Sequence, residues 1–299
     1  TSNPLSDATY GTSGAINYLN KFGKTGKYKS NDPVGELYYE ALRYFQGLQP
    51  TSTATSSLTT AGYDNFPIYT SWTDPVQNAC QRRNFILTIG DVNTHNDKQL
   101  PGHKSPGGVN EIVNDPARAT EAIPGSTEKF NAVDWTKLLT GFETGTSVSY
   151  TDALGRTQNT LGNPNAVTGN TNLDTKGTGS DNSSSAYYWA GAAYWANTQP
   201  IRMDTKTVDG RSQSMKDIRV KTFTIDVDEG GNGSIDGNNR TIKPRNSSFF
   251  LAGKYGWFND ANEDGNPFKT SGGSVSNQEW EDSTTPTIPD GYVLASQAQ

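Results

Sequence analysis

Several clusters of oxygen-bearing side chains are candidates for binding a divalent cation. In the clearest, Asp260, Asn262 and Asp264 alternate with other residues before Gly265. Oxygens at alternate positions converge on one Ca²⁺ in the first half of an EF-hand loop, and the glycine permits the sharp turn. The twelfth position is Ser271 instead of the bidentate Glu of the full motif. A calcium loop and a solvated acidic turn are both open interpretations.

A weaker metal candidate comprises Asp226, Asp228 and Asn232. Glycines occupy positions of this loop where a further ligand would be needed, so a plain Gly/Asn turn is the competing interpretation.

Asp91 follows a short apolar run, Phe85–Ile89, whose composition predicts a strand buried on both faces of a parallel sheet. A carboxylate at the end of a buried strand is costly unless it is paired or bound to a metal. Ligands of open α/β sheets also sit beyond the carboxyl ends of the strands. Asp91 is therefore a candidate ligand for magnesium or calcium. The alternative is that it caps the turn after the strand.

The composition indicates a modest α/β core with long polar insertions. The chain has 299 residues, enough for one large or two ordinary domains. Its hydrophobic content is only 32% and its mean hydropathy is −0.73, and 31 glycines require many loops. Aromatic residues nevertheless make up 10%, which is atypical of a disordered chain.

Charge and residue usage exclude several classes of function. The net charge is −6 without a basic tract, so we expect no nucleic-acid binding. The chain lacks an apolar run long enough to insert into a membrane. A lone Cys80 excludes an internal disulfide, and His95 and His103 offer little for histidine catalysis. We expect a non-enzyme, and a chain starting at Thr1 suggests a processed protein or a piece of a longer one.

Local patterns predict helices alternating with strands, as in a parallel-sheet fold. Asp32 suits a helix N-cap and Pro33 the first helical position. An apolar stripe follows at helical spacing: Val34, Leu37, Tyr38, Ala41, Leu42, Phe45 and Leu48. Further helices are expected at 132–139, 186–197 and 247–257, a hairpin at 147–161, and a second strand at 216–227. The apolar alternation of this strand breaks between Val220 and Phe223, which indicates a bulge or a change of burial.

Segments in one order along the chain resemble the von Willebrand factor A-like domain of type IV pilus tip adhesins and biogenesis proteins. Residues 32–45 resemble the helix of that domain, and residues 80–91 resemble its strand and the turn after it. Later segments that resemble it are residues 190–196, 220–226, 251–260 and 288–295.

The resemblance implies a Rossmann-like three-layer α/β fold across residues 1–299, with an insertion at about 92–182. Such a domain normally begins with a D-x-S-x-S strand and helix, which this sequence lacks; Asp181–Ser185 spells the motif but has the polar context of a helix N-cap. Asp32 stands where integrin-type metal sites carry Thr. The sheet is therefore expected to be incomplete, because the chain is a fragment or because a partner chain supplies the missing strands.

The resemblance also implies an extracellular location at the bacterial pilus tip. We expect a binding module that acts in adhesion and pilus assembly with a bound divalent cation, in contact with minor pilins and a surface or host receptor. The alternative is a calcium-stiffened structural module of a surface filament, without ligand binding at Asp91.

Overall fold

The protein has a mixed α/β architecture built on a small parallel sheet. A computed structural model describes residues 33–56, 59, 68–90, 94, 99–103, 118–152, 155–160, 173–174, 186–227, 234–235, 241–242, 247–269, 274–285 and 287–295. The helices are α3 (Val34–Phe45), α4 (Ser52–Thr55), α5 (Ala132–Thr144), α6 (Tyr188–Thr198) and α7 (Ser248–Trp257). None of these described helices is long and apolar enough to cross a membrane.

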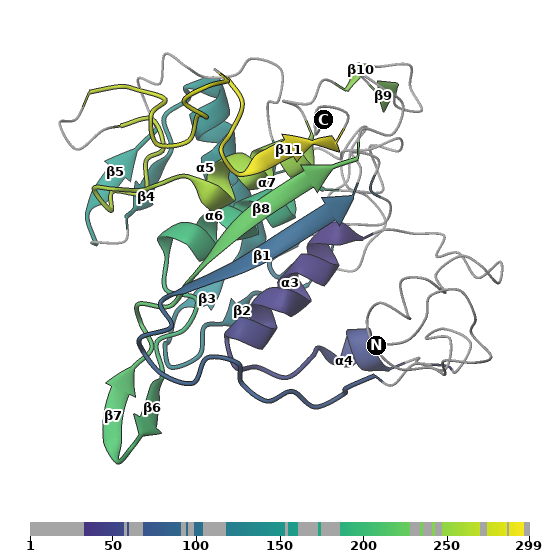
Figure 1. Cartoon of the computed structure of the whole chain (residues 1–299), viewed down its shortest axis with the longest axis vertical. Helices are drawn as coiled ribbons and strands as arrows, with labels where there is room; N and C mark the ends of the chain where they lie inside the picture. The colour runs from purple at the N-terminus through teal and green to yellow at the C-terminus, as the bar shows by residue number, and fades with distance from the viewer. Residues whose placement is uncertain are drawn as a thin grey trace.

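The main sheet contains three parallel strands in the order β1 (Arg83–Gly90), β8 (Arg219–Asp226) and β11 (Tyr292–Leu294). β1 and β8 pair over their whole lengths, from Arg83 opposite Arg219 to Gly90 opposite Asp226. The two strands predicted from the apolar runs are thus confirmed. The carboxyl ends of all three strands point the same way and lie at one end of the sheet (Figure 1).

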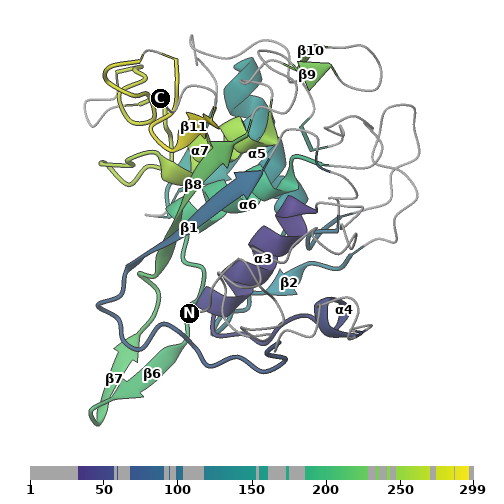
Figure 2. The same ribbon diagram turned by 45° about the vertical axis from the view of Figure 1, so that its right-hand side comes forward.

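Helices cover one face of this sheet. α6 and α7 lie behind β1 and β8 in both views, α5 packs against α6, and α3 lies beyond β1 on the side away from β8 (Figures 1 and 2). Alternate residues of β8 face this layer and are fully buried: Val220, Thr222, Thr224 and Asp226. Tyr38 of α3 joins the layer to β8 through a hydrogen bond between its hydroxyl and that of Thr222, at 2.6 Å.

The prediction that β1 is buried on both faces is wrong. Phe85, Leu87 and Ile89 are 59%, 57% and 62% exposed. Their apolar character predicts burial, but the described helices cover mainly the opposite face of the sheet. On this face the ring of Trp257, at the end of α7, contacts Phe85 and Phe223, with centroids 5.9 and 5.5 Å apart. Of the two explanations for the break in the second strand, a change of burial is confirmed and a bulge is not. β8 alternates regularly, and its apolar Phe223 and Ile225 lie on the same less covered face.

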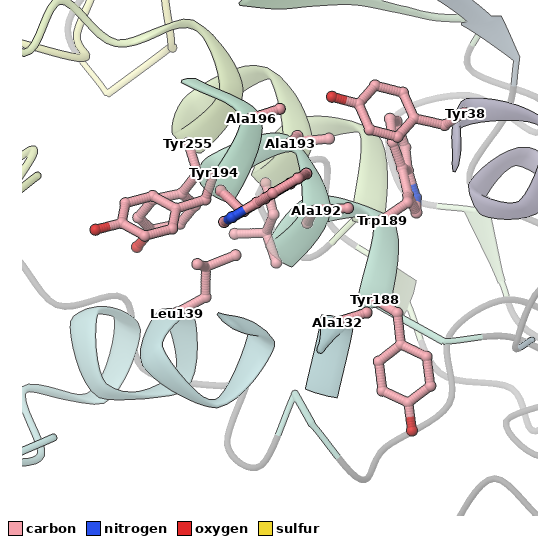
Figure 3. Packing of buried hydrophobic residues seen from close by; sticks show 14 of the residues in the cluster. Tyr38, Ala132, Leu139, Tyr188, Trp189, Ala192, Ala193, Tyr194, Ala196 and Tyr255 are labelled. Carbon is pink, nitrogen blue, oxygen red and sulfur yellow. The ribbon is translucent and has the colours of Figure 1, made fainter. Parts of the chain in front are cut away.

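The core between helices and sheet is mainly aromatic (Figure 3). Trp189 of α6 contacts Tyr38 and Phe249, with ring centroids 5.7 and 5.0 Å apart. Tyr194, one turn further along α6, packs on Phe142 of α5 at 5.9 Å. α5 therefore contributes directly to the main core, although it falls in the segment predicted to be an insertion.

Glycine allows α7 to approach the sheet closely. A Cβ atom on Gly253 would lie 2.7 Å from both the carbonyl oxygen of Gly291 and Oγ1 of Thr224. A Cβ on Gly256 would lie equally close to Cβ of Thr222. These contacts require residues without side chains on the sheet-facing side of the helix.

The predicted helices are confirmed with shifted ends. α5 continues to Thr144, five residues beyond the predicted 132–139, and Ser247 caps α7 by accepting a hydrogen bond from the Phe250 N–H. In α3, Tyr38 and Leu42 are buried as predicted, but Leu37 is 72% exposed. The spacing of the apolar residues does not distinguish the two flanks of the predicted stripe. α3 packs against the core along one flank only, so Leu37 on the other flank stays exposed.

Within the described residues, four two-stranded ribbons lie around this core. They are β2 (Glu121–Ala122) with β3 (Lys129–Phe130), β4 (Ser149–Thr151) with β5 (Thr157–Asn159), β6 (Thr205–Val208) with β7 (Arg211–Ser214), and β9 (Ser234–Ile235) with β10 (Thr241–Ile242). The β4–β5 hairpin confirms the one predicted at 147–161. The β6–β7 hairpin projects away from the body and turns at Asp209 and Gly210, whose φ angles are +52° and +75° (Figure 2).

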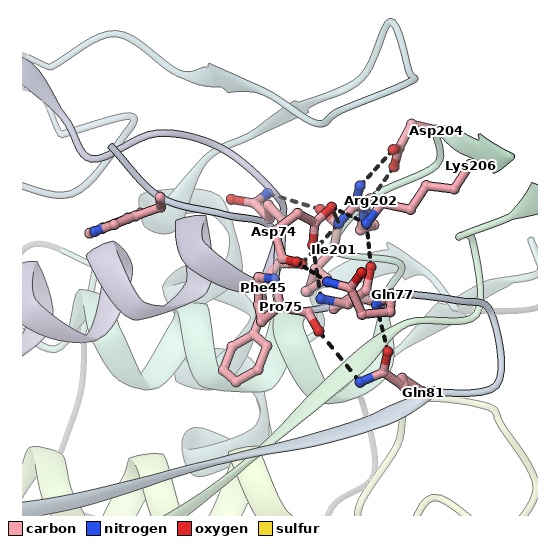
Figure 4. Close-up of polar contacts among 12 residues, drawn as sticks. Phe45, Asp74, Pro75, Gln77, Gln81, Ile201, Arg202, Asp204 and Lys206 are labelled. Carbon is pink, nitrogen blue, oxygen red and sulfur yellow. Dashed lines mark hydrogen bonds and ion pairs between the residues drawn. The ribbon is translucent and has the colours of Figure 1, made fainter. Parts of the chain in front are cut away.

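A buried arginine fixes the base of the projecting hairpin (Figure 4). Arg202 is 3% exposed; it donates to Asp74 at 2.8 Å and to both carboxylate oxygens of Asp204 at 2.6 and 2.7 Å. Lys206 pairs with the same Asp74 oxygen at 2.6 Å. Burial raises the pKa of Asp74, but hydrogen bonds from Lys206 and Arg202 outweigh it and leave that pKa below its usual value.

Candidate cation site

The acidic segment begins where α7 ends against the sheet. The Lys221 ammonium group of β8 donates to the carbonyl oxygens of Trp257 and Phe258, at 2.9 and 3.2 Å. Asn197 of α6 donates to the Phe258 carbonyl at 3.1 Å. These bonds satisfy carbonyl groups that the end of a helix leaves without partners, and they fix the point from which the acidic loop starts.

Asp260 closes the loop by accepting two backbone hydrogen bonds. Its Oδ1 accepts from the Asp264 N–H at 3.0 Å, and its Oδ2 accepts from the Gly265 N–H at 2.9 Å. Gly265 has a φ of +73°, in the region that glycine adopts without strain. The sharp turn predicted from this glycine is confirmed.

The other two predicted side chains lie in the same small loop. Asn262 Oδ1 accepts from the Asp264 N–H at 3.2 Å, so it shares that donor with Asp260. The Asn262 amide donates to Asp264 Oδ2 at 3.0 Å, and Asp264 Oδ1 accepts from the Asn266 N–H at 2.7 Å. Asp260, Asn262 and Asp264 are thus brought together.

Two buried tyrosines attach this loop to the body. Tyr194 of α6 donates to the Gly265 carbonyl at 2.7 Å, and Tyr150 of β4 donates to the Asp264 carbonyl at 3.4 Å. Burial raises the pKa of both phenols, and the nearby carboxylates raise them further. Both groups therefore stay protonated and act as hydrogen-bond donors to the loop.

Glu279, which the sequence patterns did not single out, faces the loop from a later segment. The residue is 7% exposed, and its Oε2 has no hydrogen-bond partner. Its backbone carbonyl accepts from the Asn259 N–H at 2.7 Å, which fixes it beside the start of the loop. It lies nineteen residues beyond Asp260 in no recognisable motif, so only the fold brings it here.

Burial disfavours ionisation of all three carboxyl groups of this site, and repulsion between carboxyl groups adds to this effect at Glu279 and Asp260. Burial raises the pKa of Glu279 to about 8, with repulsion from Asp260 and Asp264 as the next causes. Burial, opposed by the Gly265 N–H and reinforced by Asp264, raises the pKa of Asp260 to about 6. Burial also raises the pKa of Asp264. A cation placed among them would remove this penalty.

The donor set fits a weakly bound hard cation rather than a transition metal. No group of three or more His, Cys, Asp or Glu residues within the described part of the chain is placed to hold an ion by itself. An ion would therefore use Asp260 and Asp264 with the Asn262 carbonyl, backbone oxygens and water. Ca²⁺ accepts such mixed oxygen sets of six to eight ligands. Glu279 would act through its charge.

Of the remaining predicted ligands, the structure describes Asp226 alone. Asp226, at the end of β8, is fully buried and accepts a hydrogen bond from the Tyr292 hydroxyl at 3.0 Å. This contact joins β8 to β11 and assigns Asp226 a role within the sheet. Four other predicted ligands lie outside the described residues: Asp32, Asp91, Asp228 and Asn232.

Comparison with known proteins decides the family. A family profile described as "PilY1 homolog, second domain" matches residues 3–196, about two thirds of the chain. The chain belongs to the PilY1 homolog family. The acidic loop and Glu279 lie beyond the matched range of the PilY1 profile.

A curated PilY1 relative covers more of the chain. The type IV pilus biogenesis factor PilY1 homolog of Xylella fastidiosa is 32% identical over 258 residues, which cover 84% of this chain and 18% of the relative. The chain therefore spans less than a fifth of that PilY1 protein. No solved structure gave a significant match. The resemblance to type IV pilus biogenesis proteins is thus confirmed, and the von Willebrand factor A-like assignment stays a prediction.

Proposed function

We propose that this chain is an extracellular module of a type IV pilus tip protein, with a von Willebrand factor A-like fold, and that a divalent cation stiffens it. Membership of the PilY1 homolog family supports the pilus assignment. The parallel order of β1, β8 and β11 and their helical layer agree with a Rossmann-like sheet. Minor pilins and a surface or host receptor are the proposed partners.

One observation carries the cation proposal: the buried, unpartnered oxygen of Glu279 faces a loop that already holds two carboxyl groups of raised pKa. A buried carboxylate without a counter-charge is costly, and a backbone hydrogen bond from Ala261 offsets this cost only in part at Glu279. Calcium bound by Asp260, Asn262 and Asp264 would favour the ionised form of these carboxyl groups, balance their negative charge and tie the end of α7 to the segment around Glu279.

The stiffening role is favoured over direct ligand binding by the position of the loop. Asp264 is 7% exposed, and the tyrosines of α6 and β4 hold the adjacent carbonyl groups. An ion held by so few carboxylates belongs with the weak sites of extracellular modules, whose Kd is on the order of 10⁻⁴–10⁻³ M. Such a site fills when calcium is present at millimolar concentrations.

Adhesion through a magnesium or calcium ion at Asp91 is the second candidate. Its support is that the carboxyl ends of β1 and β8 lie side by side, with Gly90 opposite the buried Asp226. Cation-dependent binding to a surface that Asp91→Ala abolishes, without a change in calcium-dependent melting, would establish this role.

Thermal unfolding with calcium and with chelator tests the proposed site. At about 10 mM calcium, a Kd in the expected range stabilises the folded chain by about 1.4–2.7 kcal/mol. Asp260→Asn and Asp264→Asn should each abolish the increase in Tm. Glu128→Gln, an exposed acid elsewhere, is the matched control and should retain it. An equal shift in all variants, or none in the parent, contradicts the proposal.

A further inference from the structure

An apolar surface on the main sheet is largely open to solvent, with the ring of Trp257 contacting it at Phe85 and Phe223. Phe85, Leu87 and Ile89 of β1 are each more than half exposed. Phe223 and Ile225 of β8, paired with Leu87 and Ile89, continue it as half-buried neighbours. We call these five residues the open face. In both views no described helix or strand lies in front of β1 on this side (Figures 1 and 2).

This arrangement is unusual for a parallel sheet. Parallel strands are normally covered on both faces, since their crossover connections place helices there. Edge strands exposed to solvent usually carry Lys, Pro or another charge that prevents association. Between Phe85 and Ile89, β1 contains no charged residue and no proline, and the nearest charged residues, Arg83 and Lys221, lie beside Phe85 at one end of this face. The open face therefore has the composition of a buried surface.

The edge of β1 is open as well. Within the described residues, β1 pairs only with β8, and no described strand adjoins its other edge. The helical layer nevertheless extends past this edge, because α3 lies beyond β1 in both views. Even the helix-facing residues Ile86 and Thr88 are only half-buried. The helical layer is thus wider than the sheet that it covers.

We infer that another segment of the same polypeptide, outside these 299 residues, completes this sheet. A strand of that segment pairs with the free edge of β1, and an amphipathic helix packs on the open face. An additional parallel strand requires a crossover connection of a dozen or more residues, commonly a helix. One segment can therefore supply both the strand and the helix that covers the open face. The PilY1 relative offers such sequence, because the match covers only 18% of its length.

Accessibility of position 87 tests this assignment and does not depend on the cation. In a Cys80→Ser background, Leu87→Cys and the control Ser212→Cys, an exposed position of β7, are labelled with N-ethylmaleimide. The 299-residue chain and the complete gene product are compared. We expect similar rates for both cysteines in the short chain, and labelling of position 87 slowed by about tenfold or more in the complete product. Position 212 should be unaffected.

Three results overturn the inference. Equal labelling of position 87 in both proteins would show that no other segment covers the face. Slow labelling in the short chain that becomes fast on dilution would show that a second copy covers it. A complete gene product no longer than this chain would leave no segment to dock. Ile89→Cys repeats the measurement if Leu87→Cys does not give a cooperatively folded chain.

Discussion

The ammonium group of Lys254 lies 2.7 Å from Oε1 of Glu143, and both side chains are almost completely buried. This pair joins α7 to α5, and the Tyr255 hydroxyl donates to the same carboxylate oxygen at 2.6 Å. The rings of Phe268 and Trp280 enclose the ammonium group, at 4.8 and 4.2 Å.

We predict that Glu143→Ala destabilises the fold by about 3–5 kcal/mol, because it leaves a buried ammonium group without its counter-charge. Urea unfolding measures this loss. Glu128→Ala, at an exposed position, should change stability by no more than about 0.5 kcal/mol. A loss below about 1 kcal/mol for Glu143→Ala would mean that Lys254 finds another partner or that water enters.

Two leucines of α3 should respond very differently to truncation. Leu42 is fully buried, whereas Leu37 is 72% exposed. Leu42→Ala is expected to cost about 2–5 kcal/mol through lost burial and the resulting cavity. Leu37→Ala in the same chain should stay within about 0.5 kcal/mol. Denaturant unfolding of both variants would reveal an incorrect helix orientation if their order were reversed.

Gly253→Ala should destabilise the protein, although replacing glycine with alanine within a helix usually stabilises it. Alanine within a helix is normally more favourable than glycine by about 0.5–1 kcal/mol. Here the new methyl group would meet the Gly291 carbonyl and the Thr224 hydroxyl at 2.7 Å, forcing α7 away from the sheet. We expect a lower Tm in differential scanning calorimetry. A higher Tm would show that α7 does not approach β8 so closely.

Glu279 should make stability fall as pH rises when calcium is removed. Its carboxyl group ionises near 4.5 in the unfolded chain and near 8 in the folded chain. Between these values the unfolded chain releases its proton first, so the free energy of unfolding decreases with pH. In chelator, Glu279→Gln should flatten this part of the stability profile. Identical profiles for parent and variant would show that Glu279 is not buried beside the acidic loop.

The parts of this fold that could be predicted from sequence depend on the local spacing of apolar residues and on the small or polar residues that mark the ends of helices and loops. The Ser247 cap and the apolar positions that follow it define α7 within one residue. Likewise, the Asp260–Gly265 spacing predicts a sharp turn on which three side chains converge, and hydrogen bonds within the loop bring these side chains together. Each feature is decided by neighbours within a few residues.

The missed features depend on contacts between distant parts of the chain. Nothing around Glu279 indicates that it faces Asp260, because their approach follows from the path of the whole segment after α7. The pairing of Glu143 with Lys254, 111 residues apart, has the same origin. The exposure of Leu87 could not be predicted, because an apolar strand indicates a surface suited to burial but does not indicate which segment buries it.

The β6–β7 hairpin has a practical consequence for labelling this protein. Its tip, Asp209–Gly210, has positive φ angles at both positions, the signature of a tight type I′ turn, and a Cβ on Gly210 would meet no atom within 4 Å. The ion pairs of Arg202 and Lys206 hold the base of the hairpin independently of its tip. An epitope or a fluorophore-binding tag inserted between residues 209 and 210 would therefore stand clear of the body and report the position of this protein on a living cell.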